Sequence, residues 1–381
     1  MTRPADRPQA PGAGSGLVAS TGGPPPGAPA RWLTAQWAGP GIGWGARLLQ
    51  PLSWLYAGLA WAHRALYRNG LRATGRAPVP VLVVGNLVAG GAGKTPTVLV
   101  LVALLRQQGW TPGVISRGHG RYGQQSRQGD GVQAVDRLSP ASQVGDEPLL
   151  IHLRTGAPVV VGRNRLAAAH ALCQAHPGVD ILVADDGLQH HRLQHDAALW
   201  VFDDRGVGNG LRLPAGPLRE ALPSALPAQT LVLYNAARPS TPRPGLIGQR
   251  QLSGVLPLDA WWRGEPAPTD GGWPALHGRP LLAAAGLARP EPFFAMLEAR
   301  GLKIHRLPLP DHARFDTLPW PAGTPDVVVT EKDAVKLAPR RSTGTRVWVA
   351  TLDFQPEPAF ADALRALCAP FKRAAAANTT P

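Results

Sequence analysis

Short runs of β-branched and aliphatic residues alternate along the chain with longer segments whose apolar residues recur at helical spacing. The short runs are typical of buried strands, and the longer segments are typical of helices packed on a sheet. Strands are expected at 81–84, 112–116, 158–161, 180–184, 199–202 and 231–234, with helices at 98–108 and 164–175. This order predicts an α/β fold with a doubly wound, mostly parallel sheet that binds ligands at the carboxyl ends of its strands.

The same alternation returns after a stretch rich in proline and glycine at 236–280, which predicts a linker or an irregular crossing between two domains. Further strands are expected at 281–286, 327–330 and 346–350, with helices at 292–300 and 358–367. The chain is therefore divided into a larger domain at 73–240 and a second, smaller α/β domain at 241–371.

The two ends of the chain differ from this pattern. Residues 1–30 are mostly Pro, Gly, Ala and Ser and predict a disordered leader, and the low-complexity segment 372–381 predicts a disordered tail. Residues 31–72 instead hold many Trp, Tyr and Leu residues and end in a series of arginines.

The densest part of this aromatic segment, 48–67, is just about long enough to cross a bilayer, for which about 20 apolar residues are needed. It also contains Gln50, Pro51 and Arg64. Because Trp and Tyr prefer the headgroup zone and arginine prefers an anionic leaflet, we expect a helix that lies in, or dips into, the cytoplasmic face of the membrane. The alternative is a helix packed on the protein's own core.

The formal net charge of +14 comes almost entirely from arginine, since lysine occurs only at 94, 303, 332, 336 and 372. Such a balance favours an anionic partner, although part of it is explained by genome base content. The arginines are dispersed and no nucleic-acid-binding motif is present, so we expect no nucleic acid partner. The two cysteines, Cys173 and Cys368, give neither a disulfide framework nor a metal-binding spacing, which agrees with a reducing compartment.

A glycine-rich loop follows the strand expected at 81–84 and precedes a helix, which predicts a phosphate-binding loop and a P-loop NTPase type of fold. Its backbone N–H groups can surround phosphate oxygens, Lys94 can reach the β- and γ-phosphates, and the Thr95 hydroxyl can coordinate Mg²⁺. Val88 stands where the usual pattern has glycine, and the alternative is a glycine-rich hairpin that happens to carry a lysine. The expected contacts to ATP come from Ala89, Gly90, Gly91, Ala92, Gly93, Lys94 and Thr95.

Several acidic residues and histidines are candidates for the chemistry. Asp185 and Asp186 end the strand expected at 180–184, where a phosphate-loop enzyme usually places a carboxylate for Mg²⁺; the alternative is a solvated turn. From the residues alone, Asp146-Glu147 is interpreted as an ordinary acidic helix amino end. His190, His191 and His195 have no ligand set that completes a metal site, so we interpret them as polar residues near the nucleotide.

These motifs, taken together and in order, resemble the tetraacyldisaccharide 4′-kinase (lipid A 4′-kinase) family. The resemblance covers about 80–371 and includes Ser116-Arg117-Gly118-His119-Gly120, in which His119 replaces the usual aromatic residue. The other matching segments are 84–96, 144–148, 185–190, 285–286, 311–315 and 329–333.

The resemblance implies an enzyme that transfers the γ-phosphoryl group of ATP to the 4′-hydroxyl of a tetraacyldisaccharide 1-phosphate. It implies that Asp146 is the base and that His312 orients or polarises it from the second domain. It further implies Mg²⁺ or water-shell ligands at Glu147, Asp185 and Asp186, a phosphate neighbour at Gln189 and a substrate contact at Arg165.

The implied partners are ATP, Mg²⁺, the acylated disaccharide 1-phosphate lipid and a membrane surface with anionic lipids, with no obligatory protein partner. The implied location is the cytoplasmic face of the inner membrane of a Gram-negative bacterium, as a peripheral or monotopic protein. Two rival hypotheses remain: a phosphate-loop enzyme with a soluble acceptor, and a membrane-tethered ATP switch that recruits a partner.

Overall fold

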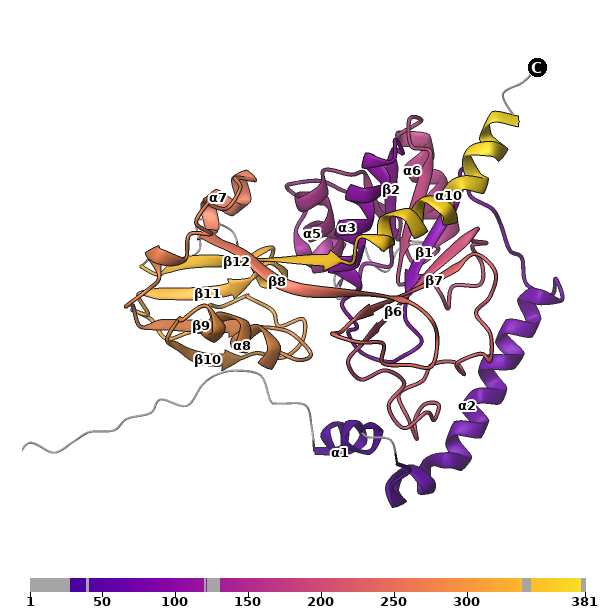
Figure 1. The fold of residues 1–381 in the computed structure, drawn as a ribbon, viewed down its shortest axis with the longest axis horizontal. Coiled ribbons are helices and arrows are strands. Elements are labelled where there is room, and N and C mark those ends of the chain that lie inside the picture. Colours follow the sequence, from indigo (N-terminus) through magenta and orange to yellow (C-terminus); the bar gives the residue numbers. More distant parts are fainter. Residues whose placement is uncertain (1–27, 39–40, 120, 122–130, 338–343, 378–381) are drawn as a thin grey trace, which may run out of the picture.

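The computed structural model describes residues 28–38, 41–119, 121, 131–337 and 344–377. Its centre is a single twelve-stranded sheet in the order β10-β9-β11-β12-β8-β7-β6-β1-β5-β2-β4-β3. We call β1–β7 with their connections the first half, and β8–β12 with theirs the second half (Figure 1). The predicted α/β class and mostly parallel sheet are confirmed, with antiparallel pairing only at β8–β12 and β3–β4 among the strands described.

The strands of the first half coincide closely with the apolar runs in the sequence. They are β1 (Val81–Gly85), β2 (Pro112–Ser116), β3 (Gln133–Val135), β4 (Val159–Val161), β5 (Ile181–Asp185), β6 (Ala197–Asp203) and β7 (Thr230–Asn235). The central strands β1, β5 and β6 are buried throughout because helices and loops cover both faces of the sheet. Of these strands, only β3 lies outside the runs from which strands were expected.

The second half differs more from prediction. Its strands are β8 (Leu246–Pro257), β9 (Leu281–Ala285), β10 (Ile304–Pro308), β11 (Asp326–Thr330) and β12 (Arg346–Pro356). The expectation of a linker at 236–280 is wrong over β8, which is a continuous strand of 12 residues. β12 is likewise longer than the apolar run at its start, because it pairs with β8 along almost its whole length. The two strands extend side by side between the halves (Figure 1).

Helices cover both faces of the sheet. They are α3 (Lys94–Gln107), α4 (Ala141–Val144), α5 (Asp146–Thr155), α6 (Arg165–Ala175), α7 (Leu258–Arg263), α8 (Glu291–Ala299), α9 (Glu331–Ala334) and α10 (Ala359–Ala377), with a 3-10 turn at Trp273–Ala275. One hydrophobic cluster runs through both halves and includes residues of α3, α5, α7 and α10. On the other face, α6 and α8 cover separate clusters.

The carboxyl-terminal helix α10 returns to the first half. The side chain of Gln108 donates to the carbonyl of Ala361, and Lys372 donates to the carbonyl of Gln108 while lying over the Trp110 ring. The helix continues to Ala377, so the expectation of disorder from 372 is wrong up to that residue, and 378–381 lie outside the described residues. Of the leader expected at 1–30, residues 1–27 also lie outside the described residues.

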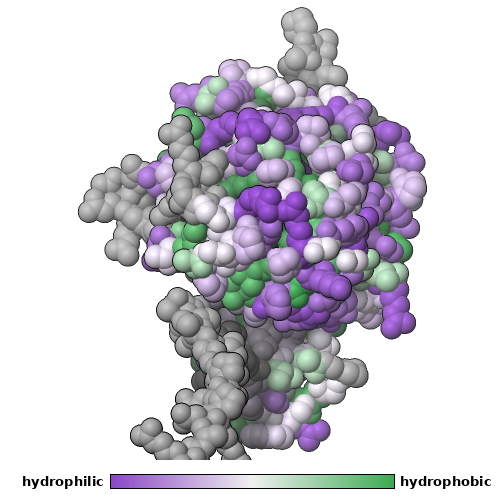
Figure 2. All heavy atoms as spheres, turned by 90° about the vertical axis from the view of Figure 1, so that its left-hand side faces the viewer, coloured by the Kyte–Doolittle hydropathy of each residue, from purple (hydrophilic) through white to green (hydrophobic). Residues whose placement is uncertain are grey.

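Two helices precede the sheet: α1 (Ala28–Trp37) and the 25-residue α2 (Trp44–Arg68), which runs along one side of the molecule (Figure 1). Among the described residues, no helix combines the length and apolar character needed to cross a membrane. The face at the second-half end of the molecule is largely hydrophilic, with apolar residues in small separate patches (Figure 2).

Because α10 contributes to the shared cluster, Phe360→Ala should lower the free energy of unfolding by about 3–5 kcal/mol, the usual cost of removing a buried phenyl ring. Phe360 is only 1% exposed. Denaturant unfolding measures the change, and Arg365→Ala on the exposed side of α10 is the control. A loss below about 1 kcal/mol would contradict the role of α10 in this cluster.

Candidate active site

The phosphate loop connects β1 to α3 at the carboxyl edge of the sheet. Gly90 and Gly93 have φ angles of +96° and +81°, which side chains other than glycine rarely adopt. A Cβ atom on Gly93 would also lie 2.0 Å from Nδ2 of Asn235, which donates to the carbonyl of Ala92. Val88, at the position of the missing glycine, is buried and forms an antiparallel bridge with Leu218. The glycines that allow the backbone conformation of this loop, Gly90 and Gly93, therefore come later in the motif than the usual first glycine.

Lys94 begins α3 and points back across the loop. Its Nζ donates to Oδ1 of Asn86 at 3.3 Å and forms an ion pair of 3.3 Å with Asp186. Gln189 lies beside this group, since its Nε2 donates to the carbonyl of Asn86 and its Oε1 accepts from Arg219. The structure thus brings Lys94, Asp186 and Gln189 together, and it adds Asn86 and Arg219, which sequence reasoning missed.

The two adjacent carboxylates at the end of β5 have different environments. Asp185 is in register with Val84 of β1, so it lies next to the start of the phosphate loop. Burial is the main cause that raises the pKa of Asp185 to about 7, and the charge of Glu147 adds to the rise. Burial pushes the pKa of Asp186 in the same direction, but Lys94 and Arg219 hold that pKa below its ordinary value.

A divalent cation is compatible with this edge of the sheet. Oδ2 of Asp185 accepts from the Ser116 hydroxyl, whereas its buried Oδ1 has no partner among the described residues. A buried carboxylate oxygen without a donor is what a hard cation would satisfy. Among the described residues, no group of three or more His, Cys, Asp and Glu side chains has the arrangement of a protein-only metal site. Mg²⁺ commonly needs only one or two carboxylates and completes its shell with substrate phosphates and water.

Asp146 and His312 meet although 166 residues separate them. Asp146 is the first residue of α5, after Gly145, whose φ of +94° sets the turn into the helix. His312 lies between β10 and β11, itself at a positive φ of 56°. Its Nδ1 lies 2.9 Å from Oδ2 and 3.1 Å from Oδ1 of Asp146. The pair therefore joins the first half to the second.

The electrostatics of this pair favour an ionised carboxylate. Burial alone would raise the pKa of Asp146, but the hydrogen bond from His312 and the charges of Lys332 and Lys336 hold it below its ordinary value. The same hydrogen bond raises the pKa of His312, although burial and Lys332 oppose the rise. Asp146 is thus available as a proton acceptor near neutral pH.

Lys332 of α9 links the remaining acidic residues. Its Nζ lies 3.0 Å from Oε1 of Glu147, 3.3 Å from Oδ1 of Asp311 and 3.4 Å from Nε2 of His312. Glu147 therefore links the Asp146–His312 pair to the carboxylates at the end of β5. It pairs with Lys332, and its charge helps to raise the pKa of Asp185. Spacing in the sequence could not assign Lys332. The scarcity of lysine in the chain was a usable signal, since three of the five lysines, at 94, 332 and 336, lie in this site.

Arg165 begins α6 and is buried, with its Nε lacking a partner among the described residues. Burial and the neighbouring charge of Arg117 lower its pKa to about 10. His190 accepts from the backbone N–H of Arg165, and burial together with Arg165 lowers the pKa of His190 to about 4. His191 lies elsewhere, against the rings of His63 and Tyr67 in α2.

Comparisons with known proteins show which family this chain resembles. The family model described as tetraacyldisaccharide-1-P 4′-kinase matches residues 45–369. A tetraacyldisaccharide 4′-kinase of Methylibium petroleiphilum is 55% identical, over 91% of this chain and 97% of the relative. One from Leptothrix cholodnii is 53% identical, over 84% and 91%. The crystal structure of LpxK from Aquifex aeolicus in complex with ATP is similar with a TM-score of 0.68 and 25% identity, covering 86% of this chain and 99% of that one.

A substitution at a loop glycine tests how the phosphate loop works. Gly93→Ala should weaken ATP binding by about tenfold or more, because an alanine at positive φ costs about 1–2 kcal/mol and its Cβ meets Asn235. Gly178→Ala is the control, since a Cβ there has nothing within 4 Å and Gly178 lies outside the loop. Calorimetric titration with ATP compares them, and equal affinities would contradict this account of the loop.

Proposed function

The chain belongs to the tetraacyldisaccharide-1-P 4′-kinase family, and from that premise we propose how its residues transfer the γ-phosphoryl group of ATP to the 4′-hydroxyl of a tetraacyldisaccharide 1-phosphate. The reaction makes the chain an ATP-dependent lipid kinase, whose product carries phosphate at both the 1 and the 4′ positions. The observation that carries the assignment of residues is the 2.9 Å contact between Asp146 and His312 beside the nucleotide-binding edge.

We assign the phosphates of ATP to the glycine-rich loop and Lys94. The loop amides and the amino end of α3 direct positive charge toward an anion, and Lys94 already lies within the group formed by Asn86 and Asp186. When ATP binds, its phosphates would take over part of the contact that Lys94 makes with Asp186. Gln189 would lie at the edge of this phosphate site, oriented by Arg219. Phosphoryl transfer depends mainly on such positioning and charge stabilisation.

The chemistry of Mg²⁺ agrees with the unsatisfied oxygen of Asp185. We propose that the ion would be held by Thr95, Asp185 and Asp186, with Glu147 as a direct or water-mediated ligand. When bound, the ion would neutralise charge on the phosphates of ATP. The ion would also bring the pKa of Asp185 back below about 7, because a cation favours the charged carboxylate.

We assign removal of the hydroxyl proton to Asp146. A sugar hydroxyl is a weak nucleophile, so a positioned base contributes about 10²–10⁴ in rate. Donation from Nδ1 of His312 keeps the carboxylate oriented, and its low pKa keeps it ionised. His312 is therefore proposed to orient the base from the second half, rather than to act as the base itself.

Arg165 is proposed to contact an anionic group of the acceptor or of the transferring phosphate. A buried guanidinium whose Nε has no hydrogen-bond partner among the described residues favours an anion, because a second arginine lies nearby and Asp185 and Asp186 only partly offset the repulsion. His190 does not add to this charge near neutral pH, since its pKa of about 4 keeps it neutral.

Helix α2 has the character of a membrane-surface helix. Its polar side faces the protein, where Ser53 donates to the carbonyl of Arg212 and Tyr56 to that of Arg219. Large apolar side chains on its other sides are 53–73% exposed: Trp44, Leu48, Leu52, Trp54, Leu55, Leu59 and Trp61. So many exposed large apolar side chains on one helix favour lipid over water. We therefore propose a peripheral location on the cytoplasmic face of the inner membrane, with anionic lipid attracted by the basic chain.

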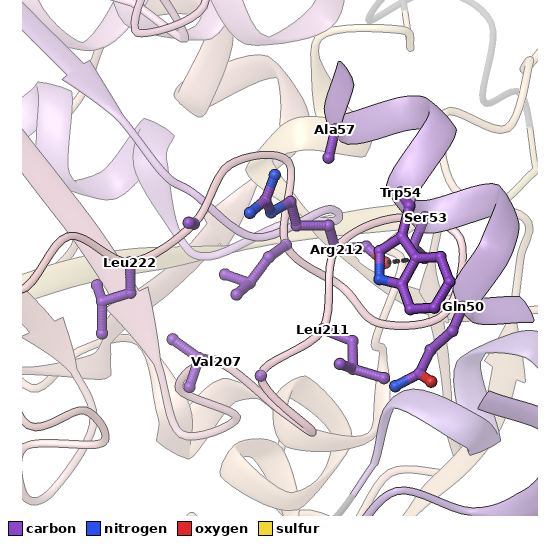
Figure 3. A pocket seen from close by; sticks show the side chains of 11 residues that line it. Gln50, Ser53, Trp54, Ala57, Val207, Leu211, Arg212 and Leu222 are labelled. Atoms are coloured by element: carbon purple, nitrogen blue, oxygen red, sulfur yellow. Dashed lines mark hydrogen bonds between the residues drawn. The ribbon is translucent and has the colours of Figure 1, made fainter. Parts of the chain in front are cut away.

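A pocket of about 340 Å³ lies between α2 and the loop at 207–222 (Figure 3). Its lining is mainly apolar and includes Val207, Leu211, Leu218 and Leu222, with Trp54 at the side of α2. We propose that it accepts part of an acyl chain of the lipid acceptor. The loop that lines the pocket is linked to the phosphate site, because Arg219, the residue after Leu218, forms an ion pair of 3.4 Å with Asp186.

The reaction is tested by transfer from γ-labelled ATP, with Mg²⁺ and detergent, to a tetraacyldisaccharide 1-phosphate. The wild-type chain should give a labelled bisphosphorylated lipid, and Asp146→Asn should lower the rate by about 10²–10⁴. Asp362→Asn, at an exposed carboxylate of α10, is the matched control. Hydrolysis of ATP without labelled lipid would instead support the soluble-acceptor or switch hypothesis.

The membrane proposal is tested with vesicles that contain anionic lipid. Leu55→Glu should lower the fraction of bound protein by about tenfold or more, because burying a leucine contributes about 1.5–3 kcal/mol. Leu138→Glu is the control, since Leu138 is also exposed but lies outside α2. Equal binding of the two variants in a sedimentation assay would argue against α2 as the membrane contact.

A further inference from the structure

Lys336 follows α9 by two residues, and its ammonium group lies near the proposed base, Asp146. Its Nζ lies 3.9 Å from Oδ2 of Asp146, and the side chain is only 11% exposed. The ammonium group also lies over the ring of Phe315, 5.0 Å from the ring centroid. Few side chains of this chain combine a full charge with so little contact to water, so the position of Lys336 needs an explanation.

Asp333 fixes the position of this ammonium group. Its Oδ1 forms an ion pair of 2.8 Å with Lys336, a contact between charges that lacks the geometry of a hydrogen bond. Its Oδ2 accepts from the backbone N–H of Gly286 and from the Thr330 hydroxyl, each at 2.8 Å. Asp333 is completely buried, and these donors come from the ends of two neighbouring strands, β9 and β11. The carboxylate is therefore held by the sheet itself, and Lys336 is held by the carboxylate.

From this arrangement we propose that Lys336 is a positioning residue for phosphoryl transfer, which acts through Asp146 and is anchored by Asp333. The proposal rests on the proposed function, in which Asp146 accepts the proton of the acceptor hydroxyl. Lys332 pairs with Glu147 and contacts Nε2 of His312, whereas Lys336 lies near Oδ2 of Asp146, the oxygen that also accepts from His312. A base held by both His312 and Lys336 needs no reorganisation when the hydroxyl arrives.

The lysine is suited to this task by its shape. An ammonium group is a compact point charge on a flexible stem, whereas a guanidinium is a wide planar fork. The space between Asp146, Asp333 and the Phe315 ring therefore favours lysine. In a chain whose basic residues are arginine at all but five positions, this explains why lysine stands here.

The decisive variant is the double substitution Lys336→Met with Asp333→Asn. Lys336→Met alone leaves a buried unpaired carboxylate and is destabilised for that reason, whereas the double variant removes both charges and keeps an acceptor for Gly286 and Thr330. We expect its kcat for lipid phosphorylation to fall by about tenfold or more while the KM for ATP changes by less than about twofold. Lys303→Met, at an exposed lysine of the same half, should leave both constants unchanged.

A double-mutant cycle with Asp146→Asn separates positioning from general stability. If Lys336 acts through Asp146, then adding the double substitution to Asp146→Asn should cause no further loss of kcat. A wild-type kcat in the double variant would mean that Lys336 serves only to neutralise Asp333, and an additive loss in the cycle would show a role independent of the base; either result overturns the proposal. Failure of the wild-type chain and of Lys303→Met to phosphorylate the lipid would instead reject the proposed function.

Discussion

The antiparallel pairing of β8 with β12 is the constraint on which the site depends. These two strands hydrogen-bond from Pro257 opposite Trp348 to Gly248 opposite Pro356, with one irregularity after Thr351. β8 also pairs with β7 of the first half, and β12 with β11 of the second. The two halves therefore share one hydrogen-bonded sheet, and the ends of their strands are fixed relative to each other. The contact between Asp146 and His312 depends on that fixed relation.

Opposite charges alternate along the line where the halves meet. Arg154 of α5 pairs with Glu331 of α9 at 2.5 Å, Lys332 pairs with Glu147, and Lys336 joins Asp333 to Asp146. Each buried charge has a partner from the opposite half or from the same turn, which is what a buried ionic group requires. On the other side of the phosphate loop, Arg289 of the second half pairs with Asp204 of the first. The nucleotide edge is thus flanked by ionic contacts that both halves must supply.

Local pattern was sufficient for much of the fold and for half of the site. The apolar runs located β1, β2, β5, β6 and β7 because these strands are buried on both faces. The loop before Lys94 and the pair Asp185-Asp186 were recognisable because their chemistry is contained in short segments. β8 was missed because its proline and glycine content resembles a linker, and its pairing is decided by a strand almost a hundred residues away. The pairing of Asp146 with His312 was inferred from the family resemblance. The positions of Lys332 and Lys336 in the site were predicted neither from local pattern nor from the resemblance, because a contact between distant segments produces no pattern of residue spacing.

The return of α10 to the first half has a consequence for how the chain is made. Phe360, Leu364, Cys368 and Phe371 complete a cluster to which α3 and α5 also belong. These residues follow every strand that the structure describes, so they are synthesised after the strands whose apolar surface they cover. The first half therefore leaves part of its apolar surface uncovered until α10 has been made and has folded back onto it. For this protein, the order of translation delays the completion of the nucleotide-binding half until α10 is present, although the phosphate loop itself is made much earlier.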